Sequence, residues 1–91
     1  MRSKKKIDEA VDRLFDIVWW NRHKVVEAEC KRTGKYPPQK IWKEALRQAD
    51  RIEKYIPADE LTLSDFDWGM VNGKLSALRW VLGCEWDFLD S

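Results

Sequence analysis

The sequence predicts a single all-α domain over residues 1–91, a three-helix bundle with a short C-terminal turn that a second copy can complete. Apolar residues recur every three or four positions in three segments, which is the period of an α-helix. Glycine and proline separate these segments, and no stretch has the alternating pattern of a β-strand. A length of 91 residues corresponds to one domain, and a hydrophobic content of 44% indicates a folded protein.

The first two helices are bounded by glycine and proline. The first is expected at about residues 5–32, because Gly34 suits the left-handed position past a helix C-terminus and two prolines follow it. The second is expected at about residues 39–55 and ends at Pro57. Residues at helical spacing form their apolar faces: Ile7, Ala10, Val11, Leu14, Phe15, Val18, Val25 and Val26 in the first, and Ile41, Trp42, Ala45, Leu46, Ala49, Ile52 and Ile56 in the second.

The third helix is expected to begin after a loop at residues 57–63, with Ser64 as its N-cap, and to run to about Leu82 before Gly83 closes it. It carries two apolar faces about 150° apart. The first face comprises Trp68, Val71, Leu75, Leu78 and Leu82, and the second comprises Phe66, Met70, Gly73, Ala77 and Trp80.

Two other helices in so small a domain can cover one of these faces but not both along their whole length. One alternative is that the C-terminal turn at residues 84–90 folds back, so that Trp86 and Phe88 cover the remainder. The other is contact with a second chain, which the small residues Gly69, Gly73 and Ala77 would allow to approach closely. The sequence favours a small protein-interaction module that self-associates through the third helix, as a homo-oligomer or in a larger assembly.

Trp20 lies among charged residues, on the side of the first helix opposite Ile7 and Val18. Tryptophan is enriched at binding hot spots, so it is a candidate for partner contact. The alternative is that the loop at residues 36–38 covers it. The predicted partner-binding residues are therefore Trp20, Phe66, Met70, Gly73, Ala77 and Trp80.

A basic stripe on the second helix supports an alternative function. Its five cations project within about 80° of arc, opposite the apolar face: Lys40, Lys43, Arg47, Arg51 and Lys54. Such a row can follow nucleic-acid phosphates, which predicts a nucleic-acid-binding accessory protein. Residues 1–56 carry a net charge of +6 and residues 57–91 a net charge of −5. The alternative is therefore that the stripe is a solvated surface whose positive charge is neutralised by the acidic half of the chain.

Catalytic and metal-binding motifs are not recognisable, so we predict no enzyme, no metal and no cofactor. His23, Glu27 and Cys30 share one side of the first helix, but one histidine with one nearby cysteine matches no established ligand pattern, and we expect ordinary surface residues there. Small helical nucleotide pyrophosphohydrolases hold magnesium with paired acidic motifs on neighbouring helices. The nearest counterparts in this sequence are Glu9-x-x-Asp12 and Asp50-x-x-Glu53, which differ from those motifs in residue type and in distance.

Two cysteines do not form the disulfide framework of a small secreted domain. The N-terminal residues lack the apolar core of a signal peptide, and no apolar run is long enough to cross a membrane. A cytoplasmic protein without membrane association is expected.

The segment from Trp68 to Gly83, WGMVNGKLSALRWVLG, is followed by EWDFLD at residues 85–90. Together they resemble the C-terminal signature of a family of small uncharacterised prokaryotic helical proteins of about this length. The resemblance covers the last quarter of the chain and is fairly specific there, whereas the first two helices match nothing definite. It implies no catalytic residue, because no activity is known for that family. It does imply that the third helix and the tail are the characteristic part of the molecule.

Overall fold

The computed structural model describes residues 3–83, and in this range the chain forms four α-helices and no strand. They are α1 (Lys4–Thr33), α2 (Gln39–Tyr55), α3 (Ala58–Leu61) and α4 (Asp65–Val81). The all-α class and the three long helices are confirmed. The prediction of a loop throughout residues 57–63 is wrong, because the short helix α3 forms directly after Pro57. The predicted turn at residues 84–90 lies outside the described residues.

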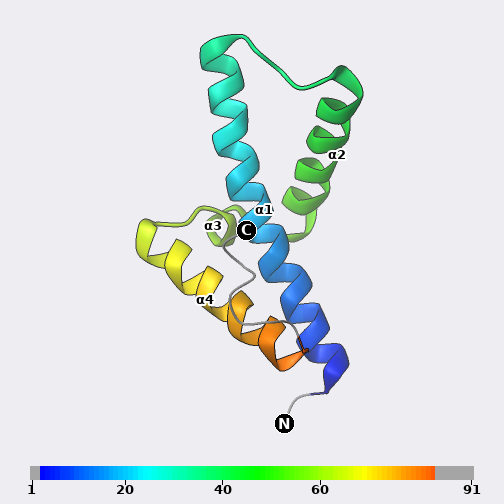
Figure 1. The fold of residues 1–91 in the computed structure, drawn as a ribbon, viewed down its shortest axis with the longest axis vertical. Helices are drawn as coiled ribbons and strands as arrows, with labels where there is room; N and C mark the ends of the chain where they lie inside the picture. Colours follow the sequence, from blue (N-terminus) through cyan, green and yellow to red (C-terminus); the bar gives the residue numbers. More distant parts are fainter. Residues whose placement is uncertain (1–2, 84–91) are drawn as a thin grey trace.

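Helix α1 is the common support of the fold, since α2, α3 and α4 each pack against it (Figure 1). With 30 residues it is about 45 Å long. The connection at residues 34–38 reverses the direction of the chain, so that α2 runs back along one side of α1. Helix α4 crosses the N-terminal half of α1 on another side.

The ends of the helices are fixed by the residues that the sequence marks. Gly34 adopts a left-handed conformation with φ 73°, and its N–H donates to the carbonyl of Cys30 at 2.8 Å. Ser64 caps α4, because its hydroxyl oxygen accepts a hydrogen bond from the backbone N–H of Asp67 at 3.1 Å. Both predicted caps are confirmed.

The hydrophobic core lies where α1, α2 and α3 meet. Its buried centre is Ile17, Ile52, Ile56 and Leu61, and around it pack Trp19, Trp20, Leu63 and Val71. Since Ile52 lies in the last turn of α2 and Ile56 directly follows the helix, the core holds the C-terminal end of α2. The N-terminal end of α2 lies farther from α1 than its C-terminal end does (Figure 1), and Ile41 is exposed there.

The predicted apolar face of the first helix needs correction in its C-terminal half. Val25 and Val26 are exposed, although their spacing suggested burial. The reason is that both side chains line a hollow between α1 and the start of α4, so that α4 does not pack closely against them. On a different side of α1, His23 is buried against Trp42 of α2, and Cys30 is buried as well. The prediction that these two are ordinary surface residues is therefore wrong.

Candidate interaction surface

Helix α4 packs one of its two apolar faces on α1, and the residues of the other face are exposed. Leu75 on the inner face is buried, and Val71 packs against the core. All five residues of the second predicted face are exposed: Phe66, Met70, Gly73, Ala77 and Trp80. The exposed fractions of the three large side chains are 75% for Phe66, 47% for Met70 and 59% for Trp80. We call these five residues the outer face of α4.

Two glycines form a shallow strip along this surface. Gly69 and Gly73 lie in the interior of α4, and a Cβ atom at either position would meet nothing within 4 Å among the described residues. Glycine inside a helix costs about 1 kcal/mol relative to alanine. The packing of α4 on α1 therefore does not require glycine at either position, and the strip can admit an approaching backbone.

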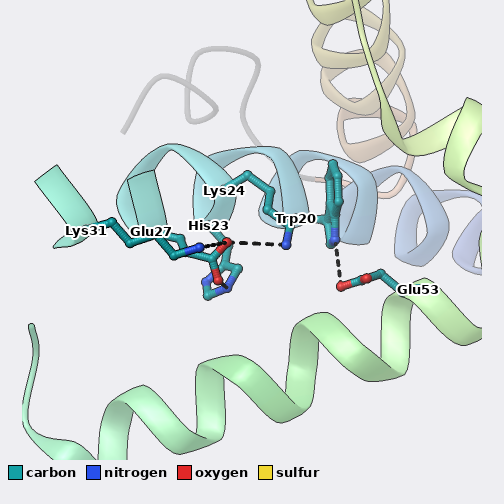
Figure 2. A network of polar contacts seen from close by, with 6 residues as sticks. All are labelled: Trp20, His23, Lys24, Glu27, Lys31 and Glu53. Carbon is teal, nitrogen blue, oxygen red and sulfur yellow. Dashed lines mark hydrogen bonds and ion pairs between the residues drawn. The ribbon is translucent and has the colours of Figure 1, made fainter. Parts of the chain in front are cut away.

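Trp20 is not part of this surface. It is partly buried between α1 and α2, where its Nε1 donates to Oε2 of Glu53 at 3.3 Å (Figure 2). The ammonium of Lys24 lies 5.2 Å from the centroid of its ring. The loop at residues 36–38 does not cover it as one alternative expected, because Tyr36 packs edge-on against Trp42 instead.

The basic stripe of α2 is exposed along its whole length but is not uniform. Arg51 donates to the carboxylate of Asp16 on α1 at 3.4 Å. Lys54 pairs with Asp50 at 2.9 Å, and the contact raises the pKa of Lys54. The other three cations form no ion pair within residues 3–83, and they occupy the N-terminal part of the stripe: Lys40, Lys43 and Arg47.

His23 lies in a polar network around Glu27 that the sequence did not reveal (Figure 2). Its ring is stacked on Trp19, with the centroids 5.1 Å apart and the planes within 5°. On the other side the ring of Trp42 lies 5.4 Å away. The Nε2 atom is buried without a hydrogen-bond partner among the described residues, and Oε2 of Glu27 is 4.0 Å from it. Burial lowers the pKa of His23, although the nearby Glu27 carboxylate opposes this shift.

Glu27 is shared among three cationic or ionisable groups. Its carboxylate lies 3.5 Å from the ammonium of Lys24 and 4.0 Å from that of Lys31, besides the contact with His23. The sequence contained a usable signal, since Trp19, His23 and Glu27 follow one another at steps of four and therefore share one side of the helix. A row of such residues on one side of a helix is ordinarily exposed to solvent. In this structure His23 is buried because α2 packs over it.

Nothing in residues 3–83 forms a metal site of three or more His, Cys, Asp or Glu side chains. A hollow of about 550 Å³ separates α1 from the start of α4, and its walls are mainly apolar. Its one hydroxyl side chain belongs to Ser64, which already caps α4. None of the helices in this range combines the length and the apolar character that crossing a membrane requires.

Comparison of the chain with protein-family models, with curated proteins and with solved structures gave no match. The arguments for function therefore rest on the residues and their geometry.

Proposed function

We propose that this protein is a small interaction module that self-associates through the outer face of α4. The observation that carries the proposal is the pair of mid-helix glycines with open space above them, beside the exposed Phe66, Met70 and Trp80. Interior glycine weakens a helix, and exposed aromatic rings are unfavourable in water. Both costs are offset if another helix lies along this strip.

The spacing of the residues favours a second copy of the same chain as the occupant. Phe66 and Trp80 each lie seven residues from Gly73, and Gly69 and Ala77 each lie four residues from it. In an antiparallel pair with a twofold axis at Gly73, Phe66 would oppose Trp80 of the partner, and Gly69 would oppose Ala77. Large side chains would then meet at the ends and small ones at the crossing point, as a self-complementary interface requires.

The size of the surface predicts a modest affinity. A buried Phe or Trp side chain removes about 150–250 Å² from water. With their present exposure, Phe66 and Trp80 of two copies would bury roughly 500 Å² together. Stable interfaces bury about 1,200–2,000 Å² in total, so Met70 and neighbouring residues must contribute and a dimer in the micromolar range is expected. The proposal includes a cytoplasmic location, where a free thiol such as that of Cys30 stays reduced.

Sedimentation equilibrium of the full chain from about 1 to 500 µM tests this function. We expect a monomer–dimer equilibrium that Gly73→Leu and Phe66→Ser each weaken at least about tenfold, or 1.4 kcal/mol. Ile41→Ser is the matched control, because Ile41 is similarly exposed but lies on α2. Circular dichroism establishes that each variant is folded. A compact monomer over the whole range would contradict the proposal, and would favour the alternative in which Trp86 and Phe88 cover the outer face within the same chain.

Three cations of α2 that form no ion pair within residues 3–83 favour a second candidate function, a nucleic-acid-binding accessory protein. Lys40, Lys43 and Arg47 are exposed and form no ion pair among the described residues, so their charges are available to phosphates. They lie on α2 and not on the outer face of α4, so the two candidate functions can be tested separately.

A further inference from the structure

Helices α1 and α2 are held together in two places of different character. Near the C-terminal end of α2, Ile52 and Ile56 pack against Ile17 of α1 in the buried core. Toward the connection at residues 34–38, a row of rings links the two helices. In that row Trp19 and His23 belong to α1, Trp42 belongs to α2, and Tyr36 of the connection packs against Trp42.

His23 is the ring at the centre of this row, because it contacts a tryptophan of each helix. Only 4% of its side chain is exposed, and Nε2 has no hydrogen-bond partner among the described residues. A groove of about 330 Å³ lies beside it, with Trp19, Trp42, Ile41 and Val26 among its walls. A buried polar atom without a partner is unfavourable already, and a charge at the same place is more so.

We propose that His23 is a proton-sensitive latch: when its imidazole takes up a proton, the C-terminal half of α1 and the N-terminal half of α2 separate, while the core end of the pair stays closed. The groove beside His23 opens in the same step. The proposal does not depend on the outer face of α4, because neither His23 nor Trp42 belongs to that helix.

The charged groups around His23 influence its pKa, and therefore the pH at which the two helices would separate. Glu27 on α1 and Glu53 on α2 favour the protonated ring, whereas Lys24 on α1 opposes it, and Arg22 of α1 lines the same groove. Burial outweighs the carboxylates, so that the pKa of His23 in the closed form lies below its ordinary value of 6.5. The imidazolium is 4.0 Å from Glu27 when it forms, but Lys24 and Lys31 already compete for that carboxylate.

The direction of the pH effect follows from this lowered pKa. The open form binds the proton more readily than the closed form, so the closed form keeps its full stability above pH 6.5 and loses it as the pH falls toward the pKa of the closed form. If the open form has the ordinary histidine pKa, the equilibrium constant for opening rises by at most about thirtyfold at pH 5.

Hydrogen exchange of the full chain, corrected for intrinsic rates and compared at about pH 7.5 and pH 5, tests the latch. We expect amides of residues 26–33 and 42–46 to lose several-fold to about thirtyfold in protection at the lower pH, because the first hydrogen-bonded amide of α2 is that of Trp42. Amides at residues 50–56 should change much less. His23→Phe replaces the titrating ring with a neutral planar one and should abolish the difference.

NMR titration of the His23 ring provides a readout that does not require the phenylalanine variant to fold. Its midpoint should lie below 6.5 in the wild type, and lower still in Glu27→Gln, because that carboxylate favours the proton. Glu29→Gln is the matched control, since Glu29 pairs with Arg32 and does not act on His23. Equal protection at both pH values, or an equal loss in the core end of α2, would overturn the proposal.

Discussion

The hydroxyl of Tyr55 on α2 donates a hydrogen bond to the carboxylate of Asp16 on α1, and the side chain of Asp16 is only 11% exposed. Arg51, one turn earlier on α2, donates to both oxygens of the same carboxylate at 3.4 Å. Asp16 is buried in spite of its charge because α2 supplies these two donors. The contact joins the two helices beside the core, and it also removes Arg51 from the set of free cations on the basic stripe.

Tyr55→Phe should lower the free energy of unfolding by about 1 kcal/mol, because it removes one of the donors to a buried carboxylate. The loss stays modest because Arg51 remains and Tyr55 is itself 43% exposed, so that water can replace part of the contact. Urea denaturation followed by circular dichroism measures the change. Tyr36→Phe is the control, since Tyr36 contacts Trp42 through its ring. Equal losses in the two variants would show that the Asp16 contact adds nothing.

Stability should also fall at alkaline pH through Tyr55. Burial and the hydrogen bond to Asp16 raise the pKa of Tyr55 to about 12, from 10.0. The neutral phenol is therefore favoured by folding, and its contribution is complete below pH 10 and is lost as the pH rises toward 12. The difference in tyrosinate absorbance between the wild type and Tyr55→Phe should show a midpoint near 12. A midpoint near 10 would mean that the hydroxyl does not hold its contact with Asp16 in solution.

Alanine should have opposite effects at two of the glycines. Gly69→Ala should stabilise the monomer by about 0.5–1 kcal/mol, because a Cβ fits in the open space there and alanine favours the helix. Gly34→Ala should destabilise it by about 1 kcal/mol, because φ is +73° at that position. Thermal or urea unfolding at a concentration well below the micromolar dissociation constant proposed for the dimer measures both. A loss of stability in Gly69→Ala would mean that the monomer itself needs the glycine, which would weaken the argument for a partner helix.

The nucleic-acid candidate makes a quantitative prediction about salt. If only Lys40, Lys43 and Arg47 neutralise phosphates, the logarithm of the affinity for duplex DNA should fall against the logarithm of salt with a slope of about −2.7, compared with about −4.5 for all five cations. Fluorescence anisotropy with a labelled duplex between about 50 and 200 mM salt gives the slope. Lys40→Glu with Lys43→Glu should weaken binding, whereas Lys54→Glu should have a much smaller effect. If no binding is detected at low salt, the stripe is a solvated surface.

The parts of the fold that follow from local chemistry were accessible from the sequence. Gly34 and Ser64 mark helix ends because their conformation or side chain serves the neighbouring backbone directly. Helix α2 occupies the predicted residues 39–55, since Pro57 sets its end. The two faces of α4 also follow from spacing alone, which is why Phe66 and the rest of the outer face of α4 could be identified as exposed apolar candidates in advance.

The arrangement of α2 against α1 could not be predicted in the same way. The side of α1 that meets α2 contains Asp16 and His23 as well as Ile17 and Trp19, and these polar residues interrupt its apolar pattern. These residues become internal because partners on α2, such as Tyr55 and Trp42, meet their polar or aromatic groups. Conversely, Val25 and Val26 have the spacing of a buried face, but a hollow separates them from the start of α4, which therefore leaves them exposed. Both errors arise from tertiary packing, which the pattern of one helix does not encode.

The position of α1 between its neighbours has a consequence for how related chains should diverge. Since α2, α3 and α4 each pack on α1, a substitution on α2 has to remain compatible chiefly with α1, and the same holds for α4. Pairs of positions that change together should therefore join α1 to one other helix more often than they join α2 to α4. The surface of either outer helix can then be altered during evolution while the other keeps its role, with α1 as the slowly changing element.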